Sequence, residues 1–321
     1  MDSRPKLAIV GSRNILGKSL KEVLERGKWE IGDLYLYEPG AREYAFVDSF
    51  RGEARVVRDP RPEELAYRDL AFFTVPVDDN LFFAPKVSVD LSGTRRDLPV
   101  YVEGINHRDI KERRLASPHP AAVGISLVLS SFRGVLKFAS SAVIEPASTL
   151  GEEAMDELFS QAVSLLNMEE VPRKVLGDTL AFDIFPKGGR RGKGRFTLEE
   201  LAVSSQIEKL VGAKHHCLIF RAGIFHRYSS LLYLEFSRKN MSIKALEKAL
   251  EANPYVLLEK KTISPLKVEE EEGYFIRVGE IKKGEGGRFW LWSVFDNLHR
   301  ASALNAVSIG FQALRSHEKD N

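Results

Sequence analysis

Residues 6–26 constrain the fold of this chain more than any other segment. An apolar run from Lys6 to Val10 stops at Gly11, and after Gly17 apolar residues recur at helical spacing. This pattern predicts a strand, a tight turn and a helix. The order is typical of the first unit of a nucleotide-binding sheet.

The rest of the first hundred residues repeats this alternation. Further strands are predicted at Leu34 to Tyr37, Leu70 to Val75 and Lys86 to Asp90, with a helix-like stretch from Asn80 to Pro85 between the last two. Strands that alternate with helices over about 100 residues indicate an α/β domain with a parallel sheet.

Long helices stand beside long strands in the remaining two thirds of the chain. Helices are predicted at Thr149 to Leu166, Leu198 to Val211, Ile243 to Glu251 and Asn305 to Arg315. Strands are predicted at Val135 to Ala142, Cys217 to Arg221, Leu231 to Phe236, Tyr274 to Ile281 and Phe289 to Phe295. We expect 217–221 and 231–236 to pair with each other, within a second domain of the α+β class.

The composition excludes several classes of protein. The 321 residues are 44% hydrophobic and 29% charged, which allows two domains with separate cores. The net charge of +2 demands no nucleic-acid partner, and the basic, glycine-rich stretch from Lys187 to Arg195 is interpreted as a solvated loop. The single cysteine, Cys217, excludes an internal disulfide. Without a signal-peptide core or a run of about 20 apolar residues, we expect a cytoplasmic protein with no membrane partner.

The first turn carries the spacing Gly-x-x-Asn-x-x-Gly, formed by Gly11, Asn14 and Gly17. Small residues here let backbone approach a pyrophosphate, Asn tolerates a left-handed conformation, and the helix N-terminus offers N–H groups to an anion. Glu38 ends the second strand, where a carboxylate favours NAD over NADP unless Arg42 reaches the same spot. The alternative is a tight turn that binds nothing. The candidates for cofactor binding are Gly11, Ser12, Asn14, Gly17 and Glu38.

The run at 291–307 reads LWSVFDNLHRASALNAV. It resembles the DNLRKGAALNAV signature of the aspartate-semialdehyde dehydrogenases. Similar stretches follow the order of that family at Ala8 to Gly17, Phe72 to Pro85, Glu103 to Asn106, Ala116 to Pro120, Ala181 to Pro186, Phe196 to Leu210 and Arg221 to Phe236. The resemblance covers nearly the whole chain.

The resemblance implies a Rossmann-like dinucleotide-binding domain at 1–120, to which a helix at 301–321 returns, and an α+β dimerisation domain at 121–300. It also implies a homodimer, NAD or NADP as cofactor, and no metal. Members of this family reduce an aspartyl phosphate to the semialdehyde in amino-acid biosynthesis, using a cysteine nucleophile and a histidine acid/base. Asn297, inside the signature, joins the cofactor-binding candidates.

The positions that the resemblance makes catalytic lack this chemistry. The cysteine position is Pro120, preceded by His119, and the histidine position is Tyr228. The active-site glutamine of the family matches Ala142, and a phosphate-binding lysine matches Ala202. Proline has no ionisable atom, and its ring suits the first turn of a helix. We therefore predict that this chain has no catalytic residue.

Three substrate contacts of the family persist. The resemblance implies that Arg96 binds a phosphate, Glu199 binds the substrate amine and Arg221 binds the substrate carboxylate. A buried guanidinium needs a partner, so the alternative to a ligand is an internal salt bridge between Arg221 and Glu199.

Two further residues carry open alternatives. Cys217 is either a core residue of an apolar strand or, in a rearranged site, a substitute nucleophile. His226 lies two residues before Tyr228 and, on a strand, would share its face as an alternative acid/base. The adjacent His215 and His216 point to opposite faces of a strand and predict no metal site.

Three hypotheses about function follow. The first is a pseudoenzyme that keeps the dimer and binds a nucleotide or an amino acid. The second is an NAD(P)-dependent oxidoreductase with altered chemistry that does not use cysteine, in which Tyr228 is the acid. The third is a structural or regulatory partner of an active paralogue.

Overall fold

The computed structural model describes residues 4–42, 46–267 and 274–318. The chain divides into two compact units, Met1–Pro118 with Ser302–Asn321, and His119–Ala301. Each unit combines a sheet with helices, which confirms the predicted α/β class.

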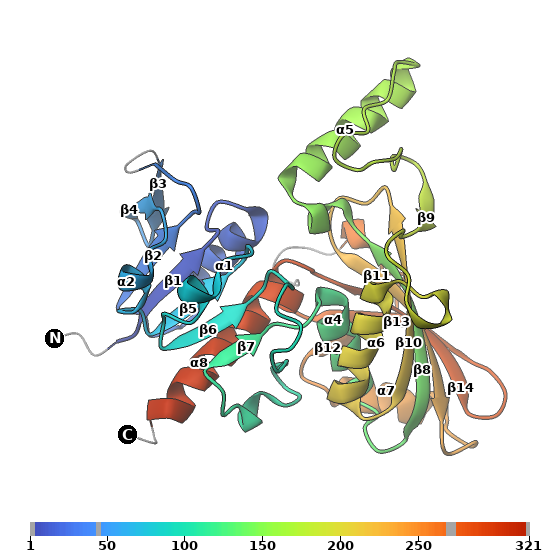
Figure 1. Cartoon of the computed structure of the whole chain (residues 1–321). Helices are drawn as coiled ribbons and strands as arrows, with labels where there is room; N and C mark the ends of the chain where they lie inside the picture. The colour runs from blue at the N-terminus through green and yellow to red at the C-terminus, as the bar shows by residue number, and fades with distance from the viewer. Residues whose placement is uncertain (1–3, 43–45, 268–273, 319–321) are drawn as a thin grey trace. The chain divides into compact units, whose positions relative to one another are not determined.

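The first unit has a seven-stranded sheet with the order β3-β4-β2-β1-β5-β6-β7 (Figure 1). Neighbouring strands are parallel except in the β3–β4 hairpin. The strands are β1 (Lys6–Val10), β2 (Asp33–Tyr37), β3 (Phe46–Phe50), β4 (Glu53–Arg58), β5 (Leu70–Phe73), β6 (Val87–Asp90) and β7 (Arg114–Ala116). The helices are α1 (Ile15–Arg26), α2 (Pro62–Leu65), α3 (Asp79–Phe82) and α8 (Asn305–Glu318).

Helices cover both faces of this sheet because its strands are apolar on both sides. Leu7 and Ile9 of β1 share a buried cluster with residues of α1 and α8. Ala8 and Val10 point to the other face and pack with Phe82 of α3. The carboxyl end of β1 therefore leads into the glycine turn between two packed layers.

The second unit has a mixed seven-stranded sheet with the order β12-β13-β14-β11-β8-β10-β9 (Figure 1). Its strands are β8 (Leu136–Glu145), β9 (Ile184–Pro186), β10 (Lys214–Ala222), β11 (Tyr228–Phe236), β12 (Val256–Leu258), β13 (Ile276–Lys283) and β14 (Arg288–Phe295). Its helices are α4 (Pro120–Ser130), α5 (Glu152–Asn167), α6 (Leu198–Val211) and α7 (Ile243–Glu251). The prediction that 217–221 and 231–236 pair is wrong, because β8 lies between β10 and β11.

Capping residues set both ends of α6. The Thr197 hydroxyl accepts from the N–H of Glu200, and the Glu200 carboxylate accepts from the N–H of Thr197, which makes a capping box. Gly212, with φ of +80°, ends the helix in the left-handed conformation. The other oxygen of Glu200 accepts from the N–H of Ile219, so this cap also fixes α6 against β10.

Helix α5 holds the segment 172–181 through two buried side chains one turn apart. The carboxylate of Glu157 accepts N–H groups from Lys174, Val175 and Leu176. The amide of Gln161 donates to two carbonyls of this segment and accepts two of its N–H groups. Seven backbone groups of an irregular segment are thereby satisfied by a single helix.

The sheet of the second unit has one face that none of the helices described for this unit covers. Across the strands, Leu218 of β10 lies opposite Ala142 of β8, and Ala142 lies opposite Leu231 of β11. Leu218 and Leu231 are each 45% exposed. The next row includes Tyr233 and Trp290, whose ring centroids lie 5.3 Å apart. This outward face is an exposed apolar surface.

Among the helices of the described ranges, none combines the length and apolar character needed to cross a bilayer.

Candidate functional site

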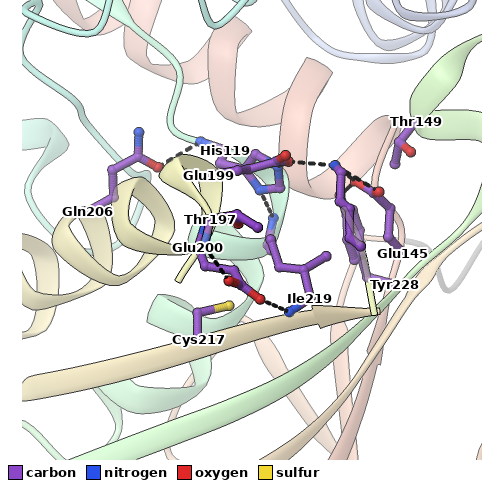
Figure 2. Close-up of polar contacts among 12 residues, drawn as sticks. His119, Glu145, Thr149, Thr197, Glu199, Glu200, Gln206, Cys217, Ile219 and Tyr228 are labelled. Carbon is purple, nitrogen blue, oxygen red and sulfur yellow. Dashed lines mark hydrogen bonds and ion pairs between the residues drawn. The ribbon is translucent and has the colours of Figure 1, made fainter. Parts of the chain in front are cut away.

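The N-terminus of α4 presents the imidazole of His119. The side chain caps the helix, because Nδ1 accepts the N–H of Ala121 at 3.2 Å. Pro120 follows at the first helical position, where a missing N–H leaves no bond unmade. Since Nδ1 accepts, the neutral ring carries its proton on Nε2. The N–H of His119 itself donates to Oε1 of Gln206 on α6, at 2.9 Å (Figure 2).

The Nε2 atom of His119 faces Glu199 in the first turn of α6. It lies 3.0 Å from Oε1 of Glu199, which is drawn beside it in Figure 2. The same oxygen lies 2.7 Å from Nζ of Lys187. Burial alone would raise the pKa of Glu199, but the hydrogen bond from His119 and the charge of Lys187 lower it to about 2. Glu199 is therefore a carboxylate at neutral pH.

A second carboxylate, Glu145 at the end of β8, is almost completely buried. Its partners are Nζ of Lys187 at 2.9 Å, Nε of Arg221 at 3.2 Å and the hydroxyl of Tyr228 at 3.1 Å. Tyr228 is itself buried, and burial together with the charge of Glu145 raises its pKa well above the ordinary value. The phenol is thus a neutral donor to Glu145. We call His119, Glu145, Lys187, Glu199, Arg221 and Tyr228 the polar network.

Three members of the polar network have the atom types of a metal site. The ligand atoms of His119, Glu145 and Glu199 all lie within 4.8 Å of one another. The ammonium of Lys187 already lies between the two carboxylates, at 2.7 and 2.9 Å. A cation would have to displace this ammonium, so the donor set does not favour a metal.

The glycine turn of the first unit is tightly packed. Gly11 has a φ of +84°, and a Cβ added there would lie 2.3 Å from Oγ1 of Thr74. A Cβ on Gly17 would lie 2.3 Å from the carbonyl oxygen of Gly11. The expectation that Asn14 uses its tolerance of the left-handed conformation is wrong, because its φ is −73°. Asn14 instead caps α1 by accepting the N–H of Gly17 at 2.8 Å.

Glu38 and Ser12 complete this turn. The carboxylate of Glu38 accepts the N–H of Arg13 at 3.0 Å through one oxygen. The hydroxyl of Ser12 is buried and, among the described residues, has no hydrogen-bond partner. Asn297 belongs to the second unit, where its amide accepts from the N–H of Arg227 and donates to the hydroxyl of Ser148.

A family profile described as "Semialdehyde dehydrogenase, dimerisation domain" matches residues 133–300, slightly more than half of the chain. The chain belongs to the semialdehyde dehydrogenase family. Full-length relatives and solved structures agree with this assignment.

The aspartate-semialdehyde dehydrogenase of Bacillus subtilis (strain 168) is 25% identical to this semialdehyde dehydrogenase homologue over 332 residues, covering 94% of this chain and 95% of that protein. A USG-1 protein homolog of Azotobacter vinelandii is 26% identical over 326 residues, covering 94% and 96%. Aspartate semialdehyde dehydrogenase II of Vibrio cholerae, complexed with ASA, has a TM-score of 0.88 at 19% identity, covering 98% and 99%. The Candida albicans aspartate semialdehyde dehydrogenase, solved with NADP, has a TM-score of 0.70 at 12% identity, covering 98% and 99%.

The structure separates the positions that the family comparison singled out. Pro120 begins α4 beside the polar network, and Ala202 lies one turn after Glu199 on the helix face that also carries Gln206. Ala142 is different: it lies on the outward face, whereas Glu145, three residues on, points to the helix-covered face. Matching Ala142 to an active-site glutamine of the semialdehyde dehydrogenases is therefore wrong.

The three substrate candidates are not together in one unit. Glu199 and Arg221 belong to the polar network. The alternative of a salt bridge between them is not realised, because Arg221 pairs with Glu145 and Glu199 pairs with Lys187. Arg96 is exposed and belongs to the first unit.

Neither of the possible replacements for the missing nucleophile and acid/base, Cys217 and His226, belongs to the polar network. Cys217 is fully buried, and burial raises its pKa to about 12. His226 precedes β11 in an irregular turn, so the expectation that it shares a strand face with Tyr228 is wrong.

Sequence reasoning missed Lys187 and Glu145. Lys187 was assigned to a solvated loop, yet its side chain is only 12% exposed. One available signal was Glu145 itself, a carboxylate ending an apolar strand, since a buried charge needs a partner elsewhere in the chain.

Proposed function

We propose that this semialdehyde dehydrogenase homologue is a pseudoenzyme that does not catalyse acyl transfer. One observation carries the proposal: α4 begins with Pro120, the position that the sequence resemblance gives to the cysteine nucleophile. The sole thiol of the chain, on Cys217, is buried with a raised pKa. Because the thiolate is the nucleophile, neither residue supplies one at neutral pH.

The acid/base position supports the same proposal. Tyr228 is neutral at physiological pH and donates its hydroxyl proton to Glu145. A phenol that keeps its proton at neutral pH has no free base to accept another one, so Tyr228 cannot act as a general base there. A general acid role, as in an oxidoreductase without cysteine, would require Tyr228 to leave Glu145 first.

The test is an activity assay with purified protein. Aspartate semialdehyde, phosphate and NADP or NAD are supplied, and reduction of the nucleotide is followed by absorbance, with the Bacillus subtilis enzyme as positive control. We expect no turnover above the buffer rate. Phosphate-dependent turnover that Cys217→Ser abolishes would contradict the proposal.

We propose that the first unit binds a dinucleotide, NAD in preference to NADP. Support comes from the packed turn at Gly11 and Gly17. Within the described ranges, the Ser12 hydroxyl has no hydrogen-bond partner, and only one oxygen of Glu38 accepts a hydrogen bond. In this proposal Asn14 shapes the turn as a cap.

Calorimetric titration with NADH and NADPH tests this assignment. We expect NADH to bind more tightly, and Glu38→Ser to reduce this preference by removing the carboxylate that repels a 2′-phosphate. Glu30→Ser, an exposed carboxylate of the same unit, is the matched control. If neither nucleotide binds at about millimolar concentration, the turn is structural only.

We propose that the chain forms a homodimer through the outward face of the second unit. We also propose that the protein works in a reducing compartment such as the cytoplasm. The face presents Leu218, Leu231 and Trp290 to solvent, and exposed apolar surfaces of this kind mark interaction sites. Obligate dimers bury about 2,000 Å² or more. An active paralogue that offered the same apolar face would be an alternative partner.

Light scattering after gel filtration measures the oligomeric state. We expect a dimer for the wild type and a shift towards monomer for Leu218→Asp with Leu231→Asp. Tyr67→Asp places the same charge on an exposed aromatic residue of the first unit and should leave the dimer intact. A stable wild-type monomer would rule out the homodimer and count against a structural-partner role.

A further inference from the structure

The charges of the polar network cancel within the chain. Glu145 and Glu199 contribute two negative charges, and Lys187 and Arg221 contribute two positive charges. Each pairs with a neighbour, and Glu145 and Lys187 are only 2% and 12% exposed. The network therefore offers no uncompensated charge to an incoming ion.

We propose that Lys187 and Glu145 act as a built-in substitute for an α-amino acid. A zwitterion is recognised by a carboxylate for its ammonium and a guanidinium for its carboxylate, as Glu199 and Arg221 would provide. The ammonium of Lys187 instead pairs with Glu199 at 2.7 Å, and the carboxylate of Glu145 pairs with Arg221 at 3.2 Å. The inference rests on the proposed function, and it assigns the two missing ligand groups to residues of this chain.

Two features hold the substitute in place. The N–H of Lys187 donates to the carbonyl of Ile219 at 2.8 Å, so its backbone is fixed where β9 pairs with β10. The ammonium also links both carboxylates, and its departure would leave the buried Glu145 with only Arg221 and Tyr228. Breaking the buried pair between Lys187 and Glu145 costs more free energy than the partly exposed contacts of a bound amino acid would regain. A free amino acid is therefore excluded.

Chemical rescue of Lys187→Ala tests the role of the ammonium. This variant removes the amine and most of its chain, leaving room for a small primary ammonium ion between the carboxylates. We expect propylammonium chloride at about 50 mM to raise the Tm of the variant, because it binds the folded state only. Propylammonium chloride should not change the Tm of wild type, and tetramethylammonium chloride should not raise the Tm of the variant.

Lys193→Ala is the matched control, because Lys193 is an exposed lysine of the same segment and has no ion-pair partner among the described residues. Its Tm should not respond to propylammonium. A folded Lys187→Ala protein whose Tm is equally insensitive would overturn the proposal.

A titration of wild type with L-aspartate decides the question even if the variant does not fold. We expect no saturable heat up to about 10 mM ligand. Saturable binding that Glu199→Gln abolishes would show that the site is vacant and sink the inference. That result would leave the proposed function intact, because binding without turnover still lacks a nucleophile. Thiol-dependent turnover in the dehydrogenase assay would instead sink the proposed function.

Discussion

The imidazole of His119 and the carboxylate of Glu199 lie 3.0 Å apart and tie the first turn of α4 to the first turn of α6. The contact is directional, because the other ring nitrogen of His119 accepts the N–H of Ala121. The start of α4 thus carries a structural cap and a hydrogen bond to a carboxylate.

Acid should weaken the contact at Glu199. Its pKa is about 2 in the folded protein and about 4.3 when unfolded, so its contribution to stability is full above pH ~4.3 and is lost as the pH falls towards 2. Glu199→Gln should lower the Tm at neutral pH and flatten its decline below about pH 4. Thermal scans at matched pH values measure this, and equal decline in both proteins would argue against the assignment.

The buried His215 predicts a second, separate acid sensitivity. Burial and the nearby His216 lower the pKa of His215 to about 3, and neither ring nitrogen has a hydrogen-bond partner among the described residues. The unfolded chain binds a proton near pH ~6.5, so stability is full above that pH and falls by about 1.4 kcal/mol per pH unit down to about pH 3.

Urea denaturation of His215→Leu at about pH 7.5 and pH 5 measures this term. Wild type should lose about 2 kcal/mol more than the variant over this interval. His216→Gln removes only the smaller cause and keeps the buried ring, so it should retain most of the wild-type loss. Parallel losses in wild type and His215→Leu would show that the ring is hydrated or paired.

The thiol of Cys217 should be unreactive in the folded protein. A pKa raised to about 12 reduces the thiolate fraction about a thousandfold relative to a free thiol, and complete burial blocks access as well. Ellman's reagent should label the chain only after unfolding in guanidinium chloride. Rapid labelling under native conditions would reopen the case for a substitute nucleophile.

The amide of Gln161 should be essential to the segment 172–181. Gln161→Ala strands two N–H groups and two carbonyls of this segment, and each buried unsatisfied group costs about 1–3 kcal/mol. We expect the free energy of unfolding to fall by about 3 kcal/mol or more in urea titrations. Asp156→Asn, an exposed change on the same helix, should stay within about 0.5 kcal/mol of wild type.

Elements whose signals are local could be predicted from the sequence. The predicted helices 198–211 and 243–251 have the observed bounds, because Thr197 and Ser242 are side-chain caps and Gly212 ends α6. The β3–β4 hairpin was missed because its strands are short, carry charges and are mostly exposed or half-buried, so no apolar run marks them. The family was also predictable, since its C-terminal signature is contiguous.

Contacts across long stretches of chain could not be predicted. Nothing near 217–236 in the sequence shows that β8, about 80 residues earlier, is inserted between the two strands. The same distance separates Arg221 from Glu145, which is why Arg221 was paired with the wrong carboxylate. The sequence also does not show which face of β8 each side chain points to. In the structure Ala142 points to the outward face and so lies outside the polar network.

Strand β8 has a different structural role on each face of its sheet. Ala142 lies between two leucines on the outward face of the sheet, and three residues later Glu145 contacts three polar partners on the helix-covered face. A substitution that shifts this strand on its outward face also moves the carboxylate that neutralises Lys187. The packing of the apolar face and the charge balance of the polar network are therefore mechanically linked through one strand.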